Sequence, residues 1–191
     1  MKGALIIVGV LVVVGLIFGG QLVGSRNLLV TEKNDIDARW AQVDNDMKRR
    51  ADLIPNLVET VKGYAKQEQT VIAEVANARS ALLGARSKGD EINANNQLSG
   101  AIGRLLVLQE NYPQLKADAS FRDLQSQLEG TENRITVARQ RYIAAVHDYN
   151  VTVRSFPTNL TAMMFGYQAK PSFTVENEKS ISTAPTVNFG K

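Results

Sequence analysis

The N-terminal segment is a long run of apolar residues. Residues 3–20 read GALIIVGVLVVVGLIFGG, 18 residues without a charged or strongly polar side chain, and Leu22 and Val23 follow shortly after. As a helix these residues span roughly 27 Å, close to the hydrocarbon thickness of a bilayer. A helix is expected because backbone polar groups in lipid must find partners within the segment. The pattern predicts a transmembrane anchor at residues 1–25, contacting the lipid bilayer through residues 3–23.

A cleaved signal peptide is the alternative interpretation of this segment. Signal peptides have apolar cores of ~7–15 residues followed by a small-x-small cleavage site. The run here is longer, and residues 21–25 resemble such a site only weakly, so we expect the segment to be retained. Lys2 precedes the run, whereas Arg26, Lys33 and Arg39 follow it. These flanking charges leave open which side of the membrane carries the rest of the chain.

Two pairs of glycines lie four residues apart in this segment, Gly15 with Gly19 and Gly20 with Gly24. Glycines at this spacing form a groove that allows a second membrane helix to approach closely. Glycine is also frequent in membrane helices that have no such contact. The first interpretation makes the four glycines a helix-packing surface of a homo-oligomer, and the second gives them no special role.

Beyond the anchor, apolar residues recur at the three-, four- and seven-residue spacing that is typical of one buried helix face. The first stripe skips one position, Arg50, and contains Ile36, Trp40, Val43, Met47, Ile54, Leu57 and Val61. Pro55 lies within this stripe and lacks the N–H that a helix interior needs. We therefore expect a kink or a break near residues 52–55.

Three further segments show helical spacing, at about 67–85, 91–111 and 119–156. The face predicted for the second consists of Val71, Val75, Ala78 and Leu82. Turn residues at 87–90, Tyr112-Pro113 and Pro157 separate or end the segments, and Asp118 is the expected N-cap of the last.

These elements predict an all-α protein in which the N-terminal transmembrane helix precedes an elongated antiparallel four-helix bundle at residues 26–166. The remaining residues, 167–191, are rich in Ser, Thr, Asn and Pro. This composition predicts an extended or disordered tail.

Composition and charge exclude several classes of function. The chain has 22 Lys and Arg residues against 19 Asp and Glu, a balance too even to indicate a nucleic-acid partner. It has no cysteine and a single histidine, which argues against a metal site. His147 and Asp148 are adjacent in a predicted helix and so do not face each other. No nucleotide, hydrolase or zinc motif is present, so we expect no enzyme activity and no cofactor.

The helical region contains motifs that resemble the signature of the LemA family. They are WAQV at 40–43, KRRADLIPNLVETVKGYA at 48–65, ENYPQLKA at 110–117, GTENRI at 130–135, ARQRY at 138–142, and the pairs YN, FP and FG at 149, 156 and 165. The match runs in order from about residue 28 to residue 189. The positions that we single out in these motifs are Trp40, Arg50, Asp52, Pro55, Asn56, Tyr64, Asn111, Tyr112, Pro113, Glu132, Asn133, Arg134, Arg139, Tyr142, Asn150 and Pro157.

The resemblance implies a bacterial protein with one membrane anchor and a LemA-like bundle, which places it in the cytoplasmic (inner) membrane. It implies no reaction, so we interpret the motif positions as structural. Arg134 could pair with carboxylates on neighbouring helices, and the charged run at 48–52 either faces solvent or forms interhelical salt bridges.

Magnetosome-associated relatives of the family are linked to membrane organisation, which favours by analogy a self-associating scaffold or assembly protein. The alternative is a membrane-tethered interaction module that binds another membrane or envelope protein.

Overall fold

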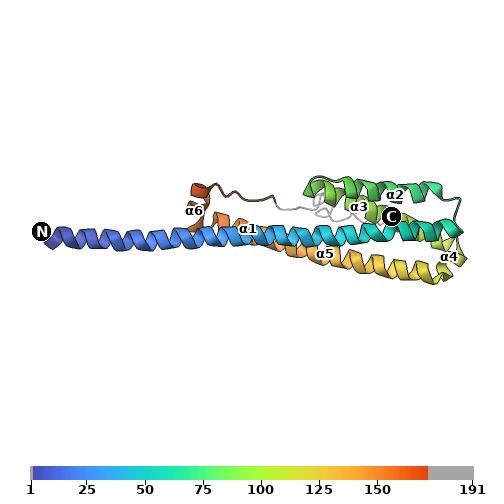
Figure 1. Cartoon of the computed structure of the whole chain (residues 1–191), viewed down its shortest axis with the longest axis horizontal. Coiled ribbons are helices and arrows are strands. Elements are labelled where there is room, and N and C mark those ends of the chain that lie inside the picture. The colour runs from blue at the N-terminus through green and yellow to red at the C-terminus, as the bar shows by residue number, and fades with distance from the viewer. Residues whose placement is uncertain (1, 172–191) are drawn as a thin grey trace, which may run out of the picture. The chain divides into compact units, whose positions relative to one another are not determined.

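The computed structural model describes residues 2–171, and all regular structure within them is helical (Figure 1). The elements are α1 (Lys2–Tyr64), α2 (Gln69–Gly84), α3 (Lys88–Val107), the 3-10 turn η1 (Leu108–Glu110), α4 (Pro113–Ala117), α5 (Ala119–Arg154) and α6 (Thr158–Phe165). The all-α prediction is confirmed for the described part of the chain. Most of the predicted tail, residues 172–191, lies outside the described residues.

The chain divides into two compact units. Unit 1 combines Met1–Ile36 with Ile143–Lys191, and unit 2 consists of Asp37–Tyr142. The long helices α1 and α5 each contribute one part to unit 1 and another part to unit 2.

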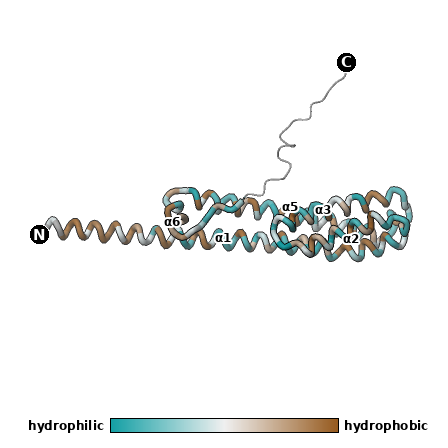
Figure 2. Tube along the Cα trace, turned by 90° about the horizontal axis from the view of Figure 1, so that it is seen from above, coloured by the Kyte–Doolittle hydropathy of each residue, from teal (hydrophilic) through white to brown (hydrophobic). Residues whose placement is uncertain are grey.

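Unit 2 is built from helices that alternate in direction. In α1, Trp40 contacts Tyr142 of α5, and Tyr64 donates a hydrogen bond to Asp118 at the start of α5, so these two helices are antiparallel. The short connection between α2 and α3 makes them antiparallel neighbours, which lie side by side in Figures 1 and 2. All seven residues of the first predicted stripe are buried, as that pattern predicted.

Local sequence features mark where α3 and α4 begin. The α3 helix begins at Lys88, earlier than expected, because the Ser87 hydroxyl accepts a hydrogen bond from the Asp90 N–H at 3.1 Å. Pro113 occupies the first turn of α4, an element that the sequence pattern did not predict. On the buried face of α2, Ile72 takes the place expected for Val71, which is only partly buried.

The predicted N-cap of α5 is confirmed. The Asp118 carboxylate accepts a hydrogen bond from the Phe121 N–H at 2.8 Å. This bond, followed by the one from the Tyr64 hydroxyl, lowers the pKa of Asp118. A lowered pKa means that the charged cap stabilises the folded unit at neutral pH and that this contribution is lost as the pH falls through the folded-state pKa.

Unit 1 contains the apolar run and the C-terminal end of α5. The run at the N-terminal end of α1, hydrophobic along its length in Figure 2, is long and apolar enough to cross a membrane, and none of its described side chains is buried. Farther along α1, Leu29 and Ile36 are fully buried, and Glu32 accepts a hydrogen bond from the Thr152 hydroxyl at 2.8 Å. The same helix therefore changes from an exposed apolar segment to one with a buried face.

Of the kink or break expected near residues 52–55, the break is wrong, because α1 continues as one helix from Lys2 to Tyr64. Proline at this position removes the N–H that would bond to the carbonyl of Ala51, four residues earlier. That oxygen instead accepts a hydrogen bond from the Arg79 side chain of α2, with an N–O distance of 2.8 Å. Since Ala51 is buried, the donor from α2 replaces a partner that water cannot readily supply.

This substitution of partners predicts energetic coupling between Pro55 and Arg79. Arg79→Met leaves the buried carbonyl unpaired and should lower the free energy of unfolding by about 1–3 kcal/mol. In a Pro55→Ala chain the backbone N–H is restored, so the same change should cost less, with a coupling of about 1 kcal/mol. Urea unfolding of the four chains in detergent micelles measures it. Arg86→Met, at an exposed arginine in the α2–α3 connection, is the control, and strictly additive effects of the two changes would contradict the explanation.

Candidate functional site

The central polar feature of unit 2 is a buried guanidinium group. Arg50 lies on the apolar face of α1 between Met47 and Ile54, and only 2% of its surface is exposed. It forms an ion pair with Glu132 of α5 and donates a hydrogen bond to the side-chain oxygen of Asn95 in α3. It also donates to the backbone oxygen of Asn95, at 3.0 Å. One side chain thus connects three helices.

Ser99 of α3 completes this network. Its hydroxyl accepts a hydrogen bond from Arg50 at 2.9 Å and donates one to the Asn95 carbonyl at 3.1 Å. Asn95 is itself buried, whereas the side chain of Glu132 is 47% exposed. The ion pair therefore extends from the core of unit 2 to its surface, where water reaches the carboxylate.

Burial makes this arrangement costly unless the partners are in place. Burial lowers the pKa of Arg50, and the charge of Glu132 together with its hydrogen bond opposes that shift. Arginine suits the position because its planar group presents several donors in fixed directions, which a lysine does not. We interpret the network as a device that fixes which helices meet and in which register, a role better attested for buried ion pairs than a net gain in stability.

The chemistry open to this network is limited. A guanidinium group does not release a proton in proteins, so it is not a general base, and its terminal nitrogens already bond to protein groups. Its Nε has no protein partner. Among residues 2–171 no cluster of three or more carboxylate or imidazole side chains could hold a metal ion. The geometry of the network fits a positioning role between helices.

A cluster of aromatic side chains in unit 2 involves residues near both ends of its sequence range. The rings of Trp40 and Tyr142 meet edge to face with centroids 5.1 Å apart. The ammonium group of Lys88 lies 5.2 Å from the Trp40 ring centroid and 3.3 Å from a carboxylate oxygen of Asp37. Burial, followed by the charge of Asp37, raises the pKa of Tyr142. Helices α1, α3 and α5 are thereby joined at a second point.

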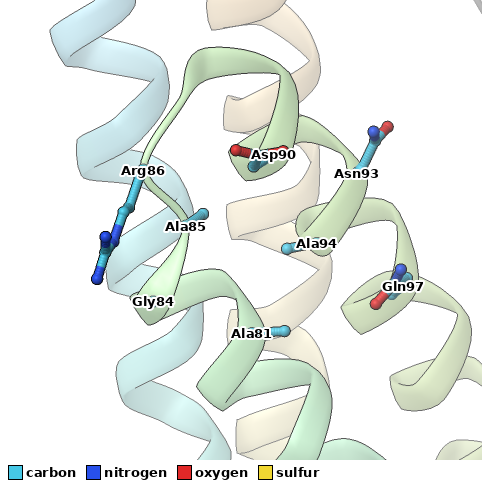
Figure 3. Close-up of a pocket in the computed structure, with 8 residues that line it drawn as sticks. All are labelled: Ala81, Gly84, Ala85, Arg86, Asp90, Asn93, Ala94 and Gln97. Atoms are coloured by element: carbon cyan, nitrogen blue, oxygen red, sulfur yellow. The ribbon is translucent and has the colours of Figure 1, made fainter.

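Two shallow depressions occur in unit 2. The first, at the connection between α2 and α3, is lined by Ala81, Gly84, Ala85, Arg86, Asp90, Asn93, Ala94 and Gln97. Figure 3 shows Arg86 pointing away from Asp90, so this depression presents no paired acid and base. The second is lined partly by Arg49 and by Arg134, the arginine for which we expected interhelical ion pairs. Arg134 is exposed there, and Glu132 of the same motif pairs with Arg50 instead.

The structure divides the predicted motif positions into two groups. Those whose side chains bond to or contact another element are Trp40, Arg50, Tyr64, Tyr112, Glu132, Tyr142 and Asn150. The exposed group is Asp52, Pro55, Asn56, Asn111, Pro113, Asn133, Arg134 and Pro157, while Arg139 is half-buried. The charged run at 48–52 contains residues of both kinds. Arg50 forms an ion pair with another helix, whereas its neighbours Lys48 and Arg49 face solvent.

We did not predict roles for Asn95, Ser99 or Arg79 from the sequence. A signal for Asn95 was present, because it lies three residues before Leu98 and seven before Ile102 and so shares their buried face. No pattern marks Arg79, whose role depends on a carbonyl in another helix. The four predicted helix-packing glycines, Gly15, Gly19, Gly20 and Gly24, face open space in this chain, since a Cβ atom added at any of them would meet nothing within 4 Å.

Comparison with known proteins yields one family and several relatives. The model of the LemA family matches residues 39–189. The magnetosome protein MamQ 2 of Paramagnetospirillum magneticum is 25% identical, over 96% of this chain and 75% of the relative. The magnetosome protein MamQ of Magnetospirillum gryphiswaldense is 23% identical, over 84% and 68%. A protein named LemA from Metamycoplasma hominis is 24% identical, over 76% and 67%.

The Arg50 network predicts a specific pattern of stabilities. Glu132→Ala leaves a buried charge without its counter-ion and should lower the free energy of unfolding by about 2–4 kcal/mol. Arg50→Met combined with Glu132→Leu removes both charges and should recover most of that loss. Glu129→Ala, at an exposed carboxylate on the same helix, should change stability by less than about 0.5 kcal/mol.

Urea unfolding in detergent micelles measures all three variants. If Glu132→Ala were no more destabilising than Glu129→Ala, the ion pair would have no role in holding unit 2 together. If the double variant were the least stable of the three, the helices would depend on the charges for more than register.

Proposed function

The chain belongs to the LemA family, and we propose that it acts as a membrane-anchored scaffold whose apolar N-terminal part of α1 crosses the bilayer once. A membrane-associated helical protein of the LemA type is what the family and the relatives support directly. The finer proposal is a self-associating assembly protein in the cytoplasmic membrane of a bacterium.

A single observation carries this proposal: the exposed apolar run and the buried core stripe belong to one uninterrupted helix. Leu5, Leu11 and Leu16 have most of their surface exposed, whereas Leu29 and Ile36 are fully buried. Apolar surface contributes about 25 cal/mol per Å² when it leaves water, so a helix this apolar requires a lipid or protein covering. Its length fits the hydrocarbon layer of a bilayer.

A scaffold role is supported by what the polar residues do in unit 2. The ion pair of Arg50 with Glu132 and the hydrogen bond from Arg79 both connect helices. The relatives that carry the name of magnetosome proteins favour, by analogy, a part in building membrane structures.

Self-association is proposed through the face that carries Gly15 and Gly19. The pair Gly20 and Gly24 lies about 140° farther around the helix, so the two pairs do not form one surface. Gly15 and Gly19 lie inside the apolar run, where close approach of two backbones is the principal source of attraction between helices. Open space around all four glycines leaves room for a second helix.

The anchoring proposal predicts the effect of charges placed in the run. Val10→Arg combined with Val14→Arg adds roughly 5–7 kcal/mol to the cost of placing this helix in a bilayer. The variant should move from the carbonate-resistant membrane pellet to the soluble fraction. Gln140→Arg with Ala144→Arg adds the same charges at the same spacing on exposed positions of α5 and should stay in the pellet. A doubly charged run that still resists carbonate would exclude this segment as the anchor.

The self-association proposal predicts the effect of bulk on the glycine face. Gly15→Ile combined with Gly19→Ile keeps the run apolar but separates the two backbones, so crosslinked dimer should decrease in vesicles at a fixed protein-to-lipid ratio. Val13→Leu with Ile17→Leu changes the opposite face and should leave dimer unchanged. Equal dimer in both variants would remove the assigned face, and a monomeric wild-type chain would remove self-association altogether.

A further inference from the structure

The short helix α6 exposes its large apolar side chains and buries small ones, which is the reverse of a helix on the surface of a water-soluble protein. Its small residues Thr161 and Ala162 are buried, while Met163, Met164 and Phe165 are 72%, 66% and 51% exposed. A helix packed on a soluble protein normally buries its largest apolar residues and exposes polar ones. The sequence of α6, TNLTAMMF, contains no charged residue that could make the exposed face soluble.

The chain that follows α6 is held against α5 by hydrogen bonds. After α6, the side-chain amide of Asn150 donates to the Lys170 carbonyl at 2.8 Å and accepts from the Lys170 N–H at 2.7 Å. The Tyr149 hydroxyl donates to the carbonyl of Gln168 at 3.2 Å. These three bonds return the chain to α5, so residues 155–167 form a closed loop with α6 inside it. Asn150, a motif residue, thus has a clear role.

The position of α6 along α1 corresponds to the end of the apolar run. The guanidinium carbon of Arg26 lies 5.4 Å from the ring centroid of Phe165, and Figures 1 and 2 both show α6 beside α1. Arg26 follows Val23 by three residues, which is about 4.5 Å along a helix axis. The contact between Thr152 and Glu32 shows that α5 runs toward the same end of α1. Phe165 therefore lies within a few ångströms of where the span ends.

We propose that α6 is a second membrane contact, which lies in the headgroup layer beside the anchor with Met163, Met164 and Phe165 directed into lipid. This inference rests on the proposed membrane anchoring. In helices that lie in the bilayer plane, apolar side chains are buried roughly 5–10 Å into the boundary between headgroups and acyl chains. The position of α6 beside the end of the span corresponds to this depth. Arg26 lies at the same level and can bond to lipid phosphate groups. The occupant is lipid because Phe165 lies against Arg26, three residues beyond the end of the apolar segment.

The absence of cysteine from the natural chain allows a direct test by spin labelling. Single labels are placed in the full-length chain at Met164→Cys in α6, at Val14→Cys in the apolar run and at Leu83→Cys, an exposed apolar position of α2. In lipid vesicles, collisions with oxygen report exposure to lipid, and collisions with a water-soluble nickel chelate report exposure to water. The ratio of oxygen to chelate collisions should be highest at Val14, intermediate at Met164 and lowest at Leu83.

The three labels separate failure of this inference from failure of the anchoring proposal. A Met164 label that matches Leu83 while Val14 reports lipid would place α6 in water and leave the anchor intact. A Met164 label shielded from both reagents, with dipolar broadening between labels, would show that a second copy of the chain covers α6 and would overturn the lipid contact. A Val14 label that matches Leu83 would remove the anchor, and the α6 contact with it.

Discussion

Polar groups that are buried away from water need hydrogen-bonding partners, and this requirement applies along the whole length of α1. In its apolar run the helix satisfies its own backbone, which is the condition for crossing lipid. At Pro55 the helix cannot do so, and Arg79 of α2 supplies the missing donor to the Ala51 carbonyl. At Arg50 the buried charge obtains its partners from α3 and α5. At both positions α1 cannot supply the hydrogen-bonding partner itself, and the helix that supplies it is held in place by the contact.

Unit 2 therefore combines two kinds of contact with different functions. The apolar stripe of α1 supplies burial, which is not directional and would tolerate helices shifted against one another. The bonds of Arg50 and the edge-to-face contact of Trp40 with Tyr142 are directional, and a shift of one helical turn would break them. This division gives a structural role to four of the motif residues, Trp40, Arg50, Glu132 and Tyr142. It also suits a scaffold, whose value lies in presenting a defined surface.

Unit 1 differs from unit 2 in the apolar surface that its helices expose. Exposed apolar side chains on the run and on α6 would be unfavourable in water, yet Asn150 and Tyr149 hold the segment after α6 in place. The two apolar surfaces lie at neighbouring levels of α1, where Arg26 contacts Phe165. Two attachments to lipid would restrict the rotation of the anchor about its own axis, whereas attachment through a single helix would not.

Elements with a local cause could be predicted from the sequence. The apolar run, the stripe from Ile36 to Val61 and the Asp118 cap depend on residue type and spacing along one helix, and the structure has all three. The pairing of polar residues between helices, in contrast, depends on the tertiary fold. The donor to the carbonyl that Pro55 leaves without its helical partner comes from Arg79, 24 residues later in sequence, and Arg50 has its partners in α3 and α5. Such pairings are set by helix packing, for which one sequence carries no periodic signal.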